Sequence, residues 1–154
     1  MASGKPAAKA PKFTIPTTAG VFRLGDQGRE NLVVYFYPRD NTPGCTIEGS
    51  DFRDLAAAFR RAGTRILGIS TDTLESHARF RDKLKFPFEL GSDESHAVAT
   101  LFGVWKQKNM YGRKMMGIER STFLIDGEGR IRREWRKVRV KGHAAEVLEA
   151  AREI

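Results

Sequence analysis

The sequence is poor in cysteine: Cys45 is the only one among 154 residues. A single thiol cannot form a disulfide within the chain, which excludes the disulfide-stapled class of secreted domains. It also excludes CxxC redox motifs and cysteine-rich zinc sites, because each needs more than one sulfur. The count therefore favours a chain that works in a reducing compartment, and we expect a cytoplasmic protein.

Long apolar runs are missing as well. No stretch approaches the roughly 20 apolar residues that cross a bilayer, so we expect no membrane partner. The first residues, "MASGKPAAKAP", lack the apolar core of a secretory signal and predict a disordered tail over residues 1–11. The length of the remainder, residues 12–154, suits a single domain.

Acidic residues are outnumbered, with 27 Lys and Arg against 19 Asp and Glu and a formal net charge of +8. Such an excess can attract acidic partners, nucleic acid among them. The basic residues are spread along the chain, however, and no RNA-binding signature or zinc finger accompanies them. We therefore expect a basic surface and no nucleic-acid partner.

Periodicity predicts the secondary structure. Residues 13–26 alternate like a small hairpin, and the apolar runs 31–37 and 64–71 are typical of strands buried on both faces of a sheet. A short strand at 88–93 and two strands joined by a turn within 121–135 are expected further on. Apolar residues at steps of three and four predict four helices, which lie at 46–62, 72–86, 97–102 and 144–151, the second capped by Asp72 and Glu75.

This order of elements predicts a single α/β domain with a parallel half and an antiparallel half. The thioredoxin-like architecture has that order. Periodicity alone leaves other α/β folds open.

Cys45 follows Thr42, Pro43 and Gly44 in a polar segment where a helix is expected to begin. A helix N-terminus stabilises an anion, and the thiolate is the reactive form of cysteine. The alternative is a small buried hydrophobe, which is the usual role of a lone cysteine. The turn-rich surroundings favour the reactive role, because ligands and reactive groups gather in such loops. The Thr42 hydroxyl serves either the thiolate or the turn.

The segment "YPRDNTPGCTIEGSDFRD" resembles the active-site segment of peroxiredoxins, whose motif spaces a proline, a threonine and a cysteine as Pro38, Thr42 and Cys45 are spaced here. It is most similar to bacterioferritin comigratory proteins, the Q-type subfamily. Four further segments resemble that subfamily in the same order, so the resemblance covers nearly the whole chain after the tail: "ILGISTDTLESHARF", "FPFELGSDESH", "NMYGRKMMGIERSTFLID" and "WRKVRVKGHAAEVL".

The resemblance implies a thioredoxin-like fold with an N-terminal β-hairpin extension and a mixed central sheet flanked by helices. It implies a thiol-dependent peroxidase, without metal or other cofactor, that reduces hydrogen peroxide and organic hydroperoxides. Cys45 takes the place of the thiolate that becomes a sulfenic acid, and Thr42 that of the hydroxyl that bonds the thiolate and the peroxide. Pro38 helps to enclose the pocket. Many relatives are monomers, and we expect a monomer here.

Further site residues follow from the same resemblance. Arg120, in "GIERSTFLID", takes the position of the arginine that reaches the active site. The substrate is expected at Pro43, Gly44 and Glu48, close to the backbone N–H groups near Gly44. Glu48 either holds the arginine in place or is an ordinary acid in the first turn of a helix.

Other conspicuous side chains are given structural roles. Trp105 and Tyr111 are expected in the pocket wall or the core. His77, His96 and His143 show no ligand spacing, so we expect them to be structural or exposed, and no metal site is predicted.

The chain departs from the subfamily in one place. Many members carry a second, resolving cysteine five residues after the first or in the next helix, where this chain has Ser50 and "HARFRDKLKF". Either an external thiol such as thioredoxin, glutaredoxin or glutathione reduces the sulfenic acid, or Ser50 is an engineered replacement of a cysteine. The "RIRREWRKVRVK" segment is a solvated strand face or steers an acidic reductant toward the site.

Two other functions stay open at this point. In a redox sensor, oxidation of Cys45 would signal to a partner without turnover. In a basic binding module, Cys45 would be incidental.

Overall fold

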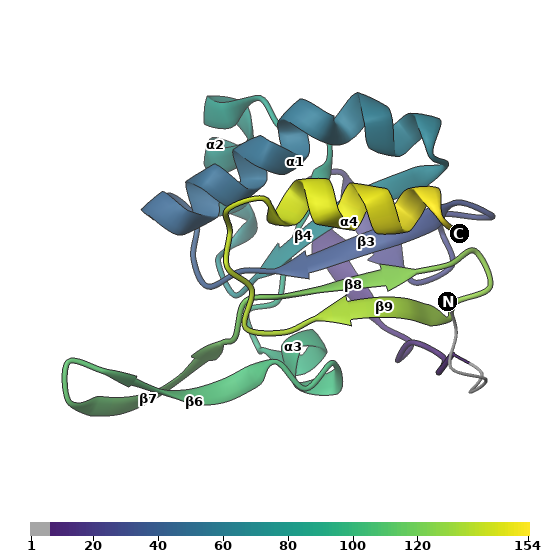
Figure 1. Ribbon diagram of the computed structural model, residues 1–154. Helices are drawn as coiled ribbons and strands as arrows, with labels where there is room; N and C mark the ends of the chain where they lie inside the picture. Colours follow the sequence, from purple (N-terminus) through teal and green to yellow (C-terminus); the bar gives the residue numbers. More distant parts are fainter. Residues whose placement is uncertain (1–6) are drawn as a thin grey trace.

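The structure, a computed structural model, describes residues 7–154, which form a mixed seven-stranded sheet with helices on both faces (Figure 1). The strand order is β2-β1-β5-β4-β3-β8-β9, and a separate hairpin pairs β6 with β7. The strands are β1 (Thr14–Thr17), β2 (Gly20–Arg23), β3 (Asn31–Phe36), β4 (Thr64–Ser70), β5 (Glu89–Ser92), β6 (Trp105–Met110), β7 (Arg113–Ile118), β8 (Ser121–Ile125) and β9 (Ile131–Trp135). The helices are α1 (Pro43–Arg61), α2 (Leu74–Leu84), α3 (Ala97–Leu101) and α4 (His143–Arg152).

The sheet has the parallel and antiparallel halves that the sequence predicted. Strands β3, β4 and β5 are parallel, whereas β8 and β9 on one side and β1 and β2 on the other run antiparallel to their neighbours. The predicted N-terminal hairpin is confirmed as β1 and β2.

Strand β3 divides the apolar interior into two layers. Its side chains alternate between the two faces of the sheet, as the period of a strand requires. Leu32, Val34 and Phe36 join the core on one face, and Val33 and Tyr35 join the core on the other. Helices α1, α2 and α4 cover the face of Val33 and Tyr35, and α3 covers the opposite face (Figure 1).

Helix α1 carries the site, and its own sequence explains where it lies. Pro43 is the first residue of the helix, where the missing N–H of proline costs no hydrogen bond. After the helix the chain changes direction at Gly63, whose φ is +63°. Phe52 and Phe59 are fully buried beneath it. A Cβ at Gly49 would lie 2.4 Å from the ring of Phe86, so only glycine lets the helix pack this closely.

The β6–β7 hairpin was not predicted. It leaves the body of the molecule and extends outward (Figure 1). Trp105 at its base is partly buried against the core, as expected, whereas Tyr111 in its turn is 100% exposed. The prediction that Tyr111 lies in the wall or core is therefore wrong, because this turn has no apolar partner to pack against.

Two smaller expectations need correction. Thr73, and not Asp72, caps α2, since its side chain accepts a hydrogen bond from the backbone of Ser76 at 3.1 Å. Within the expected tail of residues 1–11, Ala10 donates a backbone hydrogen bond to Gly129 in the turn before β9, Ala8 accepts one from Ile131 at the start of β9, and Ala10 is buried. This part of the tail is ordered, and residues 1–6 lie outside the described residues.

No helix within residues 7–154 is long and apolar enough to cross a bilayer.

Candidate active site

Cys45 is the third residue of α1, directly after the loop that follows β3. Its side chain is 1% exposed and belongs to the core cluster beneath α1. The predicted position at a helix N-terminus is therefore correct. The sulfur also lies deeper than a turn-rich segment suggested, so it combines burial with the anion-stabilising end of a helix.

Arg120 reaches this sulfur from the short link between β7 and β8. One terminal nitrogen donates to Sγ of Cys45 at 3.4 Å, and the other donates to Oε1 of Glu48 at 2.5 Å. The arginine side chain is 16% exposed. Its backbone is held as well, because the carbonyl of Arg120 accepts a hydrogen bond from Val138 at 3.0 Å. The structure thus brings together the three residues that the resemblance assigned to this position.

Glu48 is a buried carboxyl with an incomplete set of partners. Oε1 accepts from Arg120, whereas Oε2 has no hydrogen-bond partner among the described residues. Burial raises the pKa of Glu48 to about 7, although the neighbouring Arg120 charge opposes that rise. The contact of Glu48 with Arg120 is the arrangement that the first of its two expected roles requires.

Gly44 gives the arginine its room. A Cβ at this position would lie 3.1 Å from a terminal nitrogen of Arg120, tighter than an ordinary contact. Pro43, before it, is exposed and brings no N–H to the helix start. The first backbone N–H groups of α1, at Gly44 and Cys45, belong to the helix turn that has no intrahelical acceptors.

The Thr42 hydroxyl takes the turn role, one of the two roles considered for it. The hydroxyl donates to the carbonyl of Arg39 at 2.9 Å and forms no cap on α1. In the described structure it therefore stabilises the turn. Pro38 is half-buried and lies two residues after the end of β3, in the same loop.

A buried polar network lies beneath this loop and was missed by sequence reasoning. Asp40 accepts from the hydroxyl of Tyr37 at 2.6 Å and from that of Ser76 at 2.8 Å. Nδ1 of His77 lies 2.8 Å from Asp40, and Nε2 lies 2.9 Å from the carbonyl of Gly91. Because a carbonyl only accepts, Nε2 is the nitrogen that donates a hydrogen to Gly91. The network ties the loop to α2 and β5.

Asp72 extends the same network. Its Oδ2 accepts from the backbone of Asp40 at 2.8 Å and from the hydroxyl of Ser70 at 2.5 Å. One possible metal-ligating atom from each of Asp40, Asp72 and His77 lies within 4.8 Å of the other two, close enough to share a metal ion. The hydrogen bonds already engage these atoms, so the cluster is a scaffold for the loop.

His96 and His143 also make structural contacts. His96 stacks on Trp105 with ring centroids 4.2 Å apart. Nε2 of His143 lies 2.8 Å from the hydroxyl of Thr122, and burial lowers the pKa of His143 to about 4.

Lys108 is a further cation near the sulfur that sequence reasoning did not single out. It is half-buried on β6, where burial, together with the nearby Arg120 charge, lowers its pKa, and the charge of Cys45 opposes this change. The only signal for it was its place in a basic stretch before Arg120.

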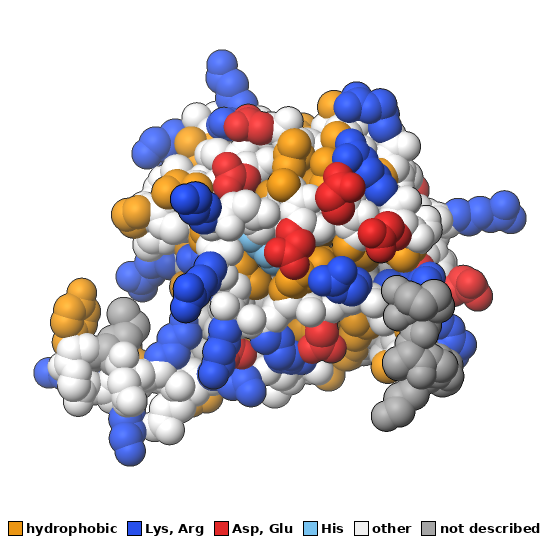
Figure 2. Space-filling model, viewed as in Figure 1, with side chains coloured by type: hydrophobic (Ala, Val, Ile, Leu, Met, Phe, Trp, Pro, Cys, Tyr) orange, Lys and Arg blue, Asp and Glu red, His pale blue; other side chains and the backbone are white. Residues whose placement is uncertain are grey.

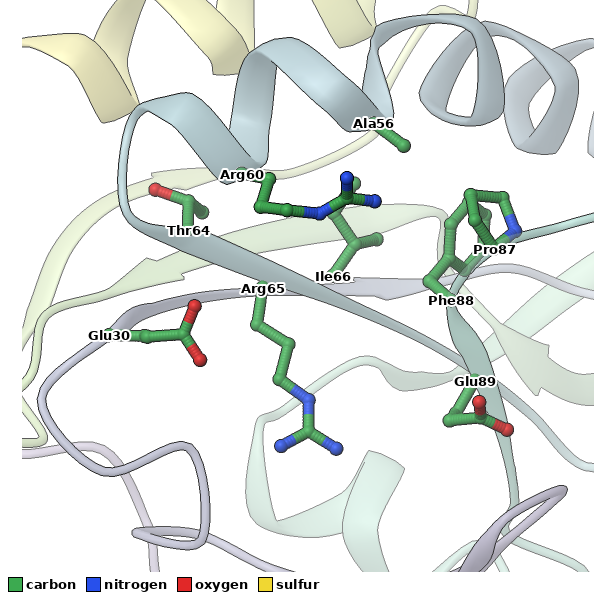
Figure 3. Close-up of a pocket in the computed structure, with 9 residues that line it drawn as sticks. All are labelled: Glu30, Ala56, Arg60, Thr64, Arg65, Ile66, Pro87, Phe88 and Glu89. Atoms are coloured by element: carbon green, nitrogen blue, oxygen red, sulfur yellow. The ribbon is translucent and has the colours of Figure 1, made fainter.

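A cavity of about 320 Å³ lies elsewhere, between α1, β4 and the start of β5 (Figure 3). Its lining includes Ala56 and Arg60 of α1, with Arg65 and Phe88 opposite. Ala56 follows Cys45 by eleven residues, roughly 16 Å along a helix. The cavity is therefore separate from the thiol site.

Comparison with known proteins agrees with this geometry. Residues 6–134 match the AhpC/TSA family. The chain is 46% identical over 147 residues to Peroxiredoxin Bcp of Bacillus subtilis, which covers 95% of this chain and 94% of that protein. It is 54% identical over 119 residues to Peroxiredoxin Bcp of Xanthomonas campestris, with coverage of 77% and 74%. A solved structure of the Xanthomonas campestris bacterioferritin comigratory protein, studied for alkyl peroxide reduction, has a TM-score of 0.87 at 46% identity and covers 92% of this chain and 90% of that chain.

A thiol held by an arginine at the start of a helix, on this thioredoxin-like fold, defines a thiol peroxidase. The chain belongs to the AhpC/TSA family, with relatives among the Bcp, or Q-type, peroxiredoxins. The predicted family and fold class are thereby confirmed. Peroxiredoxins reduce a peroxide and are then reduced themselves by a thiol. This chain contains one cysteine.

Proposed function

We propose that Cys45 reduces hydrogen peroxide and organic hydroperoxides by direct attack, and that an external thiol completes each cycle. The hydrogen bond of 3.4 Å from Arg120 to the Cys45 sulfur carries this proposal. A guanidinium at that distance favours the thiolate over the thiol, and the thiolate is the nucleophile. The helix N-terminus acts in the same direction.

In the first step the thiolate attacks one peroxide oxygen and the O–O bond breaks. The second oxygen leaves as water or an alcohol after it takes up a proton, and Cys45 loses two electrons to become a sulfenic acid. Negative charge grows on the leaving oxygen, so fixed donors around it stabilise the transition state more than the ground state.

The loop and helix start supply these donors. Arg120 and the N–H groups of Gly44 and Cys45 are the donors we assign to the peroxide. The Thr42 hydroxyl becomes another when it turns away from Arg39. Pro38 and Pro43 form walls of the substrate site, and Glu48 acts by holding Arg120 in place.

The second half of the cycle needs another molecule. Residues five apart on a helix have Cα atoms about 8 to 9 Å apart, beyond the roughly 7 Å that a disulfide spans. Position 50 holds a serine in any case. An external thiol therefore attacks the sulfenic sulfur and water leaves. A second thiol then releases Cys45 and carries away the two oxidised sulfurs as a disulfide. Thioredoxin, glutaredoxin and glutathione are the candidate reductants.

We place this activity in a cytoplasmic monomer without nucleic-acid or membrane partners. A lone cysteine fits a reducing compartment. The exposed large apolar side chains on the body come from separate elements, among them Val21, Leu74 and Leu101, and do not suggest one apolar interface.

The test is a peroxide-consumption assay with the intact mass of the protein followed in parallel. We expect rapid gain of one oxygen on wild-type protein, none on Cys45→Ser, and sustained turnover with at least one of the three candidate thiols. No oxidation of Cys45 would overturn the peroxidase mechanism. Oxidation that stops after one equivalent with every thiol would replace turnover by a sensor role.

A further inference from the structure

The β6–β7 hairpin has two different faces. Residues directly opposite each other in an antiparallel ladder share a face, and neighbours along a strand alternate. The register pairs Lys106 with Gly117, Lys108 with Met115 and Met110 with Arg113. One face, here called the basic face, therefore carries Lys106, Lys108, Arg113 and Met115.

The opposite face has a different composition and a different neighbour. It carries Trp105 and Ile118 at the base of the hairpin, both of which pack into the core beneath the sheet. Farther out it carries Gln107, Asn109, Lys114 and Met116. This face is therefore anchored at one end and polar at the other.

The base of the hairpin lies beside the thiol site. β7 ends at Ile118, two residues before Arg120, whose guanidinium donates to the Cys45 sulfur at 3.4 Å. On the basic face, the charges of Arg120 and Cys45 both act on the pKa of Lys108. Lys106 and Arg113 are exposed, and Met115 is 53% exposed. This face therefore presents three cations and a methionine on the hairpin whose base leads to Arg120.

The hairpin itself carries no acidic residue, although the charge of Glu119, beside Arg120, acts on Lys108. No acidic residue occurs between Glu94 and Glu119, and the segment that contacts the Arg120 backbone adds Lys137, Arg139 and Lys141. Figure 2 shows Lys and Arg side chains gathered where the hairpin meets the body of the molecule. The surface around the route to Cys45 is complementary to an acidic partner.

The shape of the surface favours a protein as that partner. Six residue pairs form the ladder, and at about 3.3 Å per residue it is roughly 17 Å long. A tripeptide such as glutathione would cover only part of it. A methionine exposed among cations also matches the mixture of apolar and charged contacts found at protein interfaces.

We infer that the basic face of the β6–β7 hairpin docks an acidic protein dithiol that reduces Cys45. The inference rests on the proposed function. The first thiolate of the partner attacks the sulfenic sulfur, and an S–S bond forms while the oxygen leaves as water. The second thiol attacks the partner's own sulfur in that bond, which releases the Cys45 thiol and leaves the partner as a disulfide. The partner loses two electrons, and Cys45 gains them.

The experiment compares two neighbouring cations on opposite faces of the hairpin. Arg113→Glu changes the basic face, whereas Lys114→Glu makes a similar charge reversal on the other face. Each variant is assayed with an acidic thioredoxin, its reductase and NADPH, and separately with dithiothreitol, a small neutral dithiol. The quantity compared is the ratio of kcat/KM for thioredoxin to the rate constant for dithiothreitol.

Arg113→Glu should lower that ratio roughly three- to tenfold, because reversing a rim charge slows the encounter of complementary surfaces. Lys114→Glu should change it by less than half as much. The deficit of Arg113→Glu should also shrink as salt is raised, since the Debye length falls from about 10 Å at 0.1 M toward 3 Å at 1 M.

Equal effects of the two variants would overturn the docking face, and so would reduction of the wild type by glutathione but not by thioredoxin. In both cases oxidation of Cys45 by peroxide and turnover with dithiothreitol would leave the proposed function standing. Failure of Cys45 to react with peroxide would overturn the proposed function itself.

Discussion

Arg120 and Glu48 form a buried ion pair in which the arginine also contacts Cys45, and only one of the two carboxyl oxygens of Glu48 has a hydrogen-bond partner among the described residues. Oε1 of Glu48 lies 2.5 Å from the guanidinium, which also donates to the Cys45 sulfur, while Oε2 has no partner among the described residues. Burial raises the pKa of Glu48 to about 7, against an ordinary value of 4.5. The negative charge that holds Arg120 is therefore itself sensitive to pH near neutrality.

The first prediction concerns stability against pH. The folded protein binds the Glu48 proton more tightly than the unfolded chain does, so stability from this group falls as pH rises from about 4.5 to about 7. At roughly 1.4 kcal/mol per pKa unit the loss is of the order of 3 kcal/mol. Glu48→Gln keeps an acceptor for Arg120 but cannot ionise, so it should remove most of this dependence of stability on pH.

Urea unfolding of both proteins at pH 5 and pH 8 measures this difference. Glu75→Gln is the control, because Glu75 is an exposed carboxyl on α2. A Glu48→Gln protein whose stability changes between the two pH values as much as that of the wild type would contradict the prediction.

The second prediction concerns the two contacts of Arg120. Lysine keeps the charge but has no planar fork, so it cannot donate to Cys45 and Glu48 in the same geometry. We expect Arg120→Lys to slow oxidation of Cys45 roughly tenfold or more, and Arg120→Ala to slow it by about a hundredfold or more, the cost of removing a transition-state donor. Stopped-flow measurement of the second-order rate constant with hydrogen peroxide checks both. Arg132→Lys, on the exposed strand β9, should leave the rate as it is.

The third prediction separates two roles of Thr42. Its hydroxyl donates a hydrogen bond to the carbonyl of Arg39 in this structure, whereas the proposed mechanism requires the hydroxyl to point toward the peroxide. Thr42→Ser should keep most of the rate of Cys45 oxidation, whereas Thr42→Val should lose about tenfold, because valine has the shape of threonine without the donor. If the valine variant is less stable yet reacts at the wild-type rate, the hydroxyl belongs to the turn alone.

The fourth prediction concerns Asp40 and His77. Removing one partner of a buried hydrogen-bonded pair leaves the other unsatisfied, so Asp40→Asn and His77→Gln should each cost about 3 kcal/mol of unfolding free energy. The double variant should cost less than the sum of the two, with a coupling energy of about 1 kcal/mol or more. Simple additivity in that cycle would show that the two side chains do not depend on each other. Both single variants should also slow Cys45 oxidation, since the network holds the loop with Pro38 and Thr42.

Much of the fold was predictable because its signals are local. Successive side chains of the run from Leu32 to Phe36 belong to the two apolar clusters in turn. The spacing of Phe52 and Phe59 indicates the helix α1. The β6–β7 hairpin gave no such signal, because most of its side chains face solvent on both sides and no apolar alternation marks its strands. Tyr111 was misplaced for the same reason: an aromatic residue predicts burial only where another surface covers it.

The site divides in a similar way. Cys45 could be singled out from its position before a helix, whereas Arg120 lies 75 residues away and only the family resemblance connected the two. The pairing of Asp40 with His77 spans 37 residues and leaves no pattern in either segment. The Arg39 carbonyl as partner of Thr42 was equally hidden, because a hydroxyl near a loop has several acceptors within reach and the fold decides among them.

The presence of a single cysteine has a kinetic consequence. A peroxidase with a second cysteine can store its oxidised state as an internal disulfide, whereas in the mechanism proposed above each oxidised molecule stays a sulfenic acid until it meets a thiol donor. At steady state the oxidised fraction of Cys45 is set by the ratio of peroxide influx to donor supply. Under that mechanism the oxidised fraction would report this ratio, and a prolonged shortage of donor would expose the sulfenic acid to a second, irreversible oxidation by peroxide.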